Sequence, residues 1–383
     1  MAAVRDKGMR KQFDSNYPRQ DKKNKKANRG VGRAVSVRNC LLRLLAVTSL
    51  MATPAFAADQ ALPPLTPPLA TKVAPIPDVE YFVPNPAPAW QADFAGRYWF
   101  AEAKTGKTLY GPPSIYDGAV SRLTYRDLLA NSGEIYGRMA ATNGLFIKGY
   151  AGLGALLKGS LQDEDFATPA FSPYSSTTSE QRNGYLSYGT LDLGYDVVRG
   201  GDFNIGALVG YTIFKESVSA YGCAQTATNP SVCQPAIPTA TKAITQTNIW
   251  QSPRLGGTGS VTLGRFTLNA DAAWLPYVKL NGTDSHWLRM GTATGDFSGP
   301  IPEDGTGMGY QLEALLSYVV TPNASVGVGA RYWHMQTNGT SHFENLVVNE
   351  GALPQPVSWK TDIFGAFVQG SYKFGPYPFA GMF

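Results

Sequence analysis

Residues 266–287 read FTLNADAAWLPYVKLNGTDSHW, and positions 266–280 largely alternate between apolar and polar side chains. Alternation with a period of two places side chains i and i+2 on the same face of a β-strand. The same pattern recurs at 310–320 and 364–374. The chain is therefore predicted to be all-β, with strands that are apolar on one face and polar on the other.

Two architectures produce such strands, a soluble sandwich and a membrane barrel. A sandwich buries the apolar face, whereas a barrel turns that face towards lipid. The predicted strands run to about 11 to 18 residues, longer than is usual in soluble domains. Tight turns also alternate with long connections, and the tight turns are predicted at 141–144, 199–202, 264–265 and 321–324. Together with aromatic residues near the strand ends, this asymmetry predicts a transmembrane antiparallel β-barrel with short periplasmic turns and long extracellular loops.

About ten strands are expected between these turns, and an even number places both ends of the barrel on the periplasmic side. No apolar run after residue 57 is long enough for a transmembrane helix. The predicted strands are 94–105, 119–139, 145–160, 184–198, 203–218, 245–263, 266–282, 308–320, 325–338 and 359–374.

The first 57 residues have the layout of a secretory signal peptide. A long basic region is followed by an apolar stretch at 44–52 and by Ala55-Phe56-Ala57, which matches an A-x-A cleavage site. A basic arm that binds nucleic acid is the alternative. The apolar stretch and the cleavage site directly after the basic region favour export.

Removal of this leader reverses the charge of the chain. The leader holds 13 of the 33 basic and 3 of the 28 acidic residues, so 20 basic and 25 acidic residues remain, a net charge of −5. A nucleic-acid partner is therefore not expected. The predicted location is the bacterial outer membrane.

Two segments flank the predicted barrel, which spans 93–374. Residues 58–92 are rich in proline, which favours an extended periplasmic spacer over a packed core. A segment of this kind can also be recognised as a peptide ligand. Residues 375–383 form a short C-terminal extension, whose final Phe383 is a second candidate, beside Phe374, for the terminal assembly signal.

Cys223 and Cys233 are predicted to form one disulfide. They lie close together in a loop-like stretch of an exported chain, and such pairs usually close a small loop. A metal site is the alternative, but it would need histidines or further cysteines nearby, and the sequence has none there.

Two short motifs supply the candidate catalytic residues. Asp284 and His286 are two positions apart at the end of one predicted strand, so their side chains can share a face and touch. A carboxylate beside an imidazole orients the ring and raises its pKa, which prepares the ring to take a proton from water. Asp163 and Asp165 have the same spacing past a strand on the opposite side of a ten-stranded ring. Each motif alone is more often a solvated turn, but their joint placement predicts a cleft at the barrel mouth.

These motifs give the chain a resemblance to the omptin family of outer-membrane endopeptidases. Residues 163–166 (DEDF) resemble the D-x-D-W element of the family, and residues 284–287 (DSHW) resemble its D-x-H-aromatic element. Residues 318–324 (YVVTPNA) are similar to the turn that the family has between its eighth and ninth strands. The resemblance covers nearly the whole predicted barrel, from about residue 106 to 374.

The resemblance implies an endopeptidase in which water is the nucleophile. His286 would act as general base, and Asp284 would hold the ring and stabilise its charged form. Asp163, together with Asp165, would position the water from the other wall, and one of these two carboxylates is expected to keep a proton. The substrate would be a peptide or protein, the protein a monomer, and the active site would face outwards. No metal is expected.

The chain departs from the family at the positions that recognise basic substrates. Family members that cut between basic residues place acids near the top of the first strand and two residues before the catalytic Asp. Here the first region (107–110) has no acid and the second position is Gly282, so a preference for Lys or Arg is in doubt. Family members also need lipopolysaccharide, which is the one cofactor-like requirement that the resemblance implies. Arg254 and Arg331 are basic candidates for a lipid contact, without an assigned site.

Strict alternation conflicts with this site. Counted from Phe266, Asp284 and His286 fall on the lipid-facing set, and Asp163 and Asp165 do so relative to their own strand. A β-bulge must therefore intervene in each strand, and glycines 282 and 159 are the candidates.

A second functional class also fits the sequence. A non-catalytic barrel could use its long loops as an adhesin or receptor. A small porin is a third reading, and it is disfavoured because ten strands leave a lumen that side chains largely fill.

Overall fold

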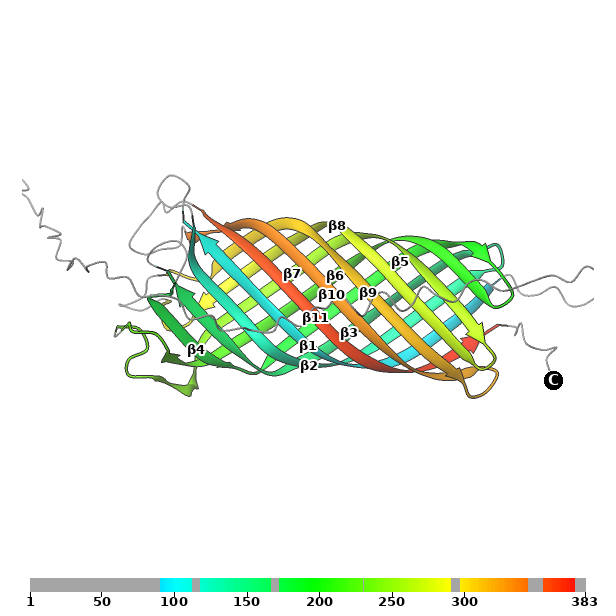
Figure 1. Cartoon of the computed structure of the whole chain (residues 1–383), viewed down its shortest axis with the longest axis horizontal. Coiled ribbons are helices and arrows are strands. Elements are labelled where there is room, and N and C mark those ends of the chain that lie inside the picture. Colours follow the sequence, from blue (N-terminus) through cyan, green and yellow to red (C-terminus); the bar gives the residue numbers. More distant parts are fainter. Residues whose placement is uncertain are drawn as a thin grey trace, which may run out of the picture. The chain divides into compact units, whose positions relative to one another are not determined.

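The computed structural model of the 383-residue chain describes residues 90–111, 118–166, 172–229, 231–290, 297–343 and 354–375. In these residues antiparallel strands close into one β-barrel (Figure 1). The strands are β1 (Trp90–Tyr110), β2 (Ala119–Ala141), β3 (Leu145–Asp165), β4 (Ser175–Gln181), β5 (Gly184–Arg199), β6 (Phe203–Gln225), β7 (Ile237–Leu263), β8 (Phe266–His286), β9 (Ile301–Val319), β10 (Ala324–Ser341) and β11 (Gln355–Phe374). The predicted signal peptide, most of the spacer and residues 376–383 lie outside the described residues. In the described part no helix is long and apolar enough to cross a membrane.

The eleven strands occupy ten positions around the ring. β4 and β5 share one position, because each pairs with β3 on one side and with β6 on the other. The break between them falls at Arg182-Asn183, where Asn183 has a φ of 57°, the left-handed conformation that asparagine tolerates better than most residues. The prediction of a ten-stranded antiparallel barrel is confirmed, and β4 is the segment that the sequence pattern missed.

The strands extend further from the short turns than predicted. The four tight turns lie where the sequence placed them, whereas β3, β6 and β8 continue to Asp165, Gln225 and His286. Cys223, near the end of β6, forms a disulfide with Cys233 in the following connection, with Cα atoms 5.7 Å apart. The long connections therefore begin well away from the short turns.

The outer surface changes from apolar to polar partway along each strand. On β1 the outward side chains are Phe94, Tyr98 and Phe100, followed by the charged Glu102 and Lys104. Most other strands change in the same way, and the outward charged residues and histidine beyond the change include Asp127, Lys158, Lys279, His334 and Asp362. A lipid-facing apolar band bounded by polar residues is the signature of a transmembrane barrel. We call the part between the short turns and this change the membrane-spanning half, and the remainder the outer half.

Ion pairs and aromatic rings cross the lumen at one level of the membrane-spanning half. The guanidinium of Arg331 binds the carboxylates of Glu134 and Glu313, each at 2.6 Å. Arg97 binds the same two carboxylates, at 2.9 and 3.2 Å. The rings of buried aromatic residues pack around Arg331, among them Trp99, Tyr150 and Trp333. Arg331 is only 1% exposed, so these carboxylates and rings shield its guanidinium from solvent.

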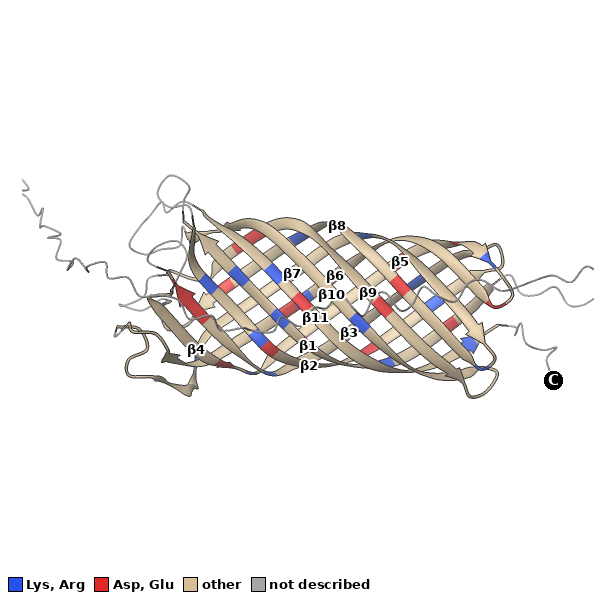
Figure 2. Ribbon diagram, in the orientation of Figure 1, with Lys and Arg blue, Asp and Glu red and all other residues tan. Residues whose placement is uncertain are grey.

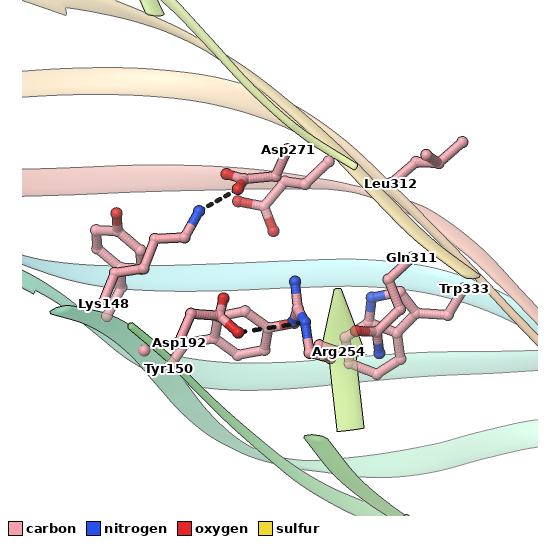
Figure 3. A pocket seen from close by; sticks show the side chains of 11 residues that line it. Lys148, Tyr150, Asp192, Arg254, Asp271, Gln311, Leu312 and Trp333 are labelled. Atoms are coloured by element: carbon pink, nitrogen blue, oxygen red, sulfur yellow. Dashed lines mark hydrogen bonds and ion pairs between the residues drawn. The ribbon is translucent and has the colours of Figure 1, made fainter. Parts of the chain in front are cut away.

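Further ion pairs lie beside this layer (Figure 3). The ammonium of Lys148 binds Asp271, and the guanidinium of Arg254 lies 3.4 Å from Asp192. Figure 2 shows acidic and basic residues distributed along the whole barrel, on strands from every part of the sequence. Arg254 and Arg331 are therefore luminal, and the expectation that they are candidates for a lipid contact was wrong.

A β-bulge in β8 reverses the direction of its side chains. Leu275 pairs with Gly309 of β9 and Val278 pairs with Gly307, so β8 holds one residue more than its partner between these pairs. Pro276 lies inside the bulge, where a residue without a backbone N–H costs the sheet little.

This bulge corrects the predicted faces of the strand. Trp274 points outwards, but Val278 and Leu280, which the alternation placed on the lipid side, are completely buried inside the barrel. The bulge lies at 276–277 and not at Gly282, because the ladder is regular from Val278 to Asp284.

β3 and β2 contain the corresponding irregularity. Leu156 and Lys158 of β3 pair with two adjacent residues of β2, which leaves Leu157 as an extra residue. On β2 the irregularity includes Asp127, with a φ of 54°. Gly159, the predicted bulge, is two positions beyond Leu157. A bulge was needed in each strand, and both lie nearer to the membrane than expected.

Candidate active site

The four predicted catalytic residues lie at one end of the barrel, in the outer half. Asp163 and Asp165 lie at the end of β3 that is farthest from the short turns. Asp284 and His286 lie at the corresponding end of β8. The sequence placed them in turns just beyond the strands, whereas the structure places them within the strands. Strand geometry therefore fixes their directions.

Asp284 and His286 are in direct contact. The Nε2 of His286 lies 3.0 Å from Oδ2 of Asp284, the arrangement that the i, i+2 spacing predicted. Asp284 is buried, and the side chain of His286 is 17% exposed. Its ring packs against Phe297, with ring centroids 5.6 Å apart. The imidazole is thus held on one side by a carboxylate and on the other by an aromatic ring.

Burial and charge act in opposite directions on this pair. Burial alone would raise the pKa of Asp284, but the charges of His286 and Lys107 hold it below its ordinary value. Burial lowers the pKa of His286, and the neighbouring Asp284 charge more than offsets this, so that its pKa lies above the ordinary value. Asp284 is therefore a carboxylate at neutral pH and makes the ring more basic.

A lysine that the sequence reasoning missed binds the same carboxylate. The Nζ of Lys107, on β1, donates to Oδ2 of Asp284 at 2.5 Å and to Oε1 of Glu303, on β9, at 2.6 Å. It also donates to Oε1 of Gln246 at 3.1 Å and lies over the ring of Trp359. The Lys107 side chain is 3% exposed and that of Glu303 is fully buried. Three strands thus contribute to one buried ion cluster beneath His286.

A hydrogen-bonded network supports this cluster from below. Gln246 donates from Nε2 to Glu303 and to Asn248, both at 2.9 Å. Asn248 in turn donates to Glu216 at 3.2 Å, which also accepts from Thr105 at 2.9 Å. Because every one of these side chains is buried, the network fixes Lys107 and Glu303 in place.

A carboxylate does lie next to Gly282, the position at which the sequence has no acid. Gly282 pairs with Glu303 across β8 and β9, and a Cβ at Gly282 would meet Oε2 of Glu303 at 3.1 Å. The carboxylate of the neighbouring strand therefore lies beside the position where β8 itself has no side chain.

Asp163 and Asp165 form the opposite wall. Burial, followed by the charge of Asp165, raises the pKa of Asp163 to about 7. Burial also raises the pKa of Asp165, against a hydrogen bond from Ser121 and the charge of Arg289. Burial is thus the larger cause of the raised pKa of Asp163, and the repulsion between two acids at this spacing, on which the sequence prediction rested, adds to it.

The two walls act on each other electrostatically. The His286 charge lowers the pKa of Asp163, and the Asp163 charge raises the pKa of His286. Tyr125, on β2, is also buried, and the charges of both Asp284 and Asp163 raise its pKa. Its hydroxyl, Oδ1 of Asp163 and Oδ1 of Asp284 have no hydrogen-bond partner among the described residues. Each wall therefore carries a buried carboxylate oxygen without a hydrogen-bond partner among the described residues.

A family model described as "Omptin family" matches residues 132–355. Among solved structures, the chain is similar to the outer membrane protease OmpT of Escherichia coli, with a TM-score of 0.59 and 17% identity over 74% of this chain and 97% of that chain. The translocator domain of the autotransporter NalP of Neisseria meningitidis is also similar, with a TM-score of 0.30 and 13% identity over 73% of this chain and 88% of that chain. A search of curated proteins found no match.

Proposed function

Because this chain belongs to the omptin family, we propose that it is an outer-membrane endopeptidase whose nucleophile is a water molecule bound between β3 and β8. The substrate would be a peptide or protein outside the cell, and the protein would act as a monomer. The observation that carries the proposal is the contact between His286 and Asp284, 3.0 Å apart, in electrostatic contact with Asp163 on the other wall.

The proposed reaction uses these groups in a fixed order. Neutral His286 takes a proton from the water while the water oxygen attacks the scissile carbonyl carbon. Asp284 stabilises the imidazolium that forms and keeps the ring in place. When the C–N bond breaks, His286 returns the proton to the departing nitrogen.

The opposite wall would hold the water. A carboxyl of the Asp163/Asp165 pair that keeps its proton near pH 7 can both donate and accept a hydrogen bond. Asp163 would therefore orient the water towards the carbonyl, and Asp165 would keep the pKa of Asp163 high.

The outward direction of the site is part of the proposal. Both ends of the described barrel, β1 and β11, begin or end beside the short turns, as expected for a chain that enters from the periplasm. The ion-pair and aromatic layer around Arg331 favours a peptidase over a porin, because side chains fill the lumen at that level. Activity is expected to require lipopolysaccharide, as the family resemblance implies.

Cleavage of a peptide library by the purified barrel, reconstituted with lipopolysaccharide, tests the proposal. His286→Ala should lower kcat/KM by about 10² to 10⁴, because a general base contributes that much. His334→Ala is the matched control, since His334 also contacts an aspartate, Asp362, but lies on the outside of the barrel. Cleavage that survives in His286→Ala, or a wild type that cuts nothing, would refute the assignment.

A further inference from the structure

The ammonium of Lys107 fills the position of a cation beside the proposed general base. Its Nζ and the Nε2 of His286 contact the same oxygen, Oδ2 of Asp284, at 2.5 and 3.0 Å. A group at the Nζ position is therefore separated from the proposed base only by this carboxylate oxygen. If His286 acts as the base, this region is close enough to receive the side chain of a substrate residue next to the scissile bond.

Two buried carboxylates converge on that position. Asp284 and Glu303 come from adjacent strands, β8 and β9, and Lys107 reaches both from β1 on the other side of the barrel. A pair of buried carboxylates without a cation is strongly unfavourable. With Lys107 in place, the pair is already neutralised in part, and a second cation would meet the lysine charge.

We propose that Lys107 is an internal substitute for a substrate cation, and that it directs cleavage to peptide bonds whose neighbouring side chain carries no positive charge. This inference rests on the proposed peptidase function and adds the class of substrate. It also assigns a role to Glu303, as the acid that would receive a basic side chain if the lysine were absent.

The geometry makes a matched pair of variants available. Lys107→Ala removes the charge and opens space for three carbons and an ammonium, one methylene less than a butylammonium ion or a substrate lysine side chain. Lys107→Met removes the same charge but fills the space. A cation site should therefore appear in Lys107→Ala and not in Lys107→Met.

The first measurement does not depend on activity. Thermal unfolding of the refolded barrel is followed with butylammonium chloride and with sodium chloride at equal ionic strength. Butylammonium should raise the midpoint of Lys107→Ala, because a ligand that binds only the folded state stabilises it. It should leave the wild type and Lys107→Met unchanged, and Lys107→Ala combined with Glu303→Gln should lose the effect.

The second measurement is cleavage of peptides that differ only in the residue next to the scissile bond. The wild type should prefer an uncharged residue over Lys by roughly tenfold or more, which corresponds to about 1.4 kcal/mol. Lys107→Ala should reduce or reverse this preference, whereas Lys107→Met should not.

The outcomes separate the two proposals. A wild type that prefers Lys or Arg, or a Lys107→Ala barrel that butylammonium does not stabilise, overturns the role of Lys107. If no variant cuts any peptide, the peptidase function fails, and the unfolding measurement still decides whether Lys107 occupies a cation site. If Lys107→Ala folds only when butylammonium is present, the role of Lys107 is supported; if butylammonium does not restore folding, that role is overturned.

Discussion

One carboxylate oxygen of Asp284 contacts both Lys107 and His286. The charges of these groups determine the pH dependence expected of the site. His286 must be neutral to accept a proton, so activity falls as the pH drops through its pKa. The Asp284 charge raises that pKa and the Lys107 charge lowers it. The acidic limb of kcat/KM should therefore lie above the ordinary imidazole value of about 6.5.

Lys107→Met tests this balance. Removing the ammonium takes away a charge that lowers the pKa of His286, so the acidic limb should move to higher pH. The measurement is kcat/KM against pH for the wild type and the variant on an uncharged peptide. A limb that stays in place or moves to lower pH would show that Lys107 does not act on the ring. Lys279→Met, an outward-facing lysine of β8, is the control.

The sequence was sufficient to predict contacts between residues of the same strand. It was not sufficient to predict contacts between residues of different strands. Asp284 and His286 are neighbours at i, i+2, so their contact can be predicted from one strand alone. Lys107 and Glu303 meet Asp284 only through the register of β8 with β9 and the closure of the ring. The sequence did contain a signal for Lys107. It lies an even number of residues from Trp99 and Ala103 on β1, so its side chain faces inwards as theirs do. A lysine that faces inwards needs a partner.

At the level of the strand, the bulge in β8 turns the proposed catalytic pair, Asp284 and His286, inwards. Sequence reasoning showed that a bulge was necessary but selected a glycine, because glycine is common at bulges. Pro276 was the better signal, since a proline cannot donate to the ladder and is confined to edges and bulges. The ends of β3 and β8 were also predicted too short, because residues 162–165 (QDED) and 283–286 (TDSH) are polar on both faces and lose the alternation.

Deletion of Tyr277 tests the role of this bulge. Removing one residue restores strict alternation, so Asp284 and His286 should point outwards and cleavage should be lost, while the apolar face from Phe266 to Trp274 is unaltered. Assembly is followed by heat-modifiable mobility on gels, and activity by peptide cleavage. The control replaces Tyr277 with Phe, which keeps the extra residue and should retain activity. Full activity of the deletion variant would show that the bulge does not orient the pair.

At the scale of the whole barrel, the buried ion pairs in the lumen tie opposite walls together. Arg331 joins Glu134 of β2 to Glu313 of β9. Arg331→Met should destabilise the barrel by about 3 to 5 kcal/mol, because it leaves buried carboxylates with less counter-charge. Urea unfolding in lipid vesicles measures the change. Arg265→Met, in the exposed turn after β7, should cost less than about 1 kcal/mol, and equal effects of the two substitutions would contradict this account.

The architecture as a whole was the most predictable feature of the chain. A chain in lipid must satisfy all its backbone hydrogen bonds internally and present an apolar outer surface. The strand number, the turn positions and the direction of amphipathicity can therefore be predicted from the alternation. The split of one ring position into β4 and β5 was not predictable in the same way. Residues 175–181 (SSTTSEQ) are polar throughout, so they carry no periodic signal.

The change from apolar to polar on the barrel surface would set the height above the membrane at which the proposed chemistry takes place. On β1 it falls at Glu102, and Lys107 lies further along the same strand, a separation of about 13 Å for tilted strands. For a peptidase of this build, a target anchored in the same bilayer must carry its cleavable bond on a stalk of at least that length. Freely diffusing peptides meet no such limit, whereas proteins lying flat against the lipid headgroups are out of reach.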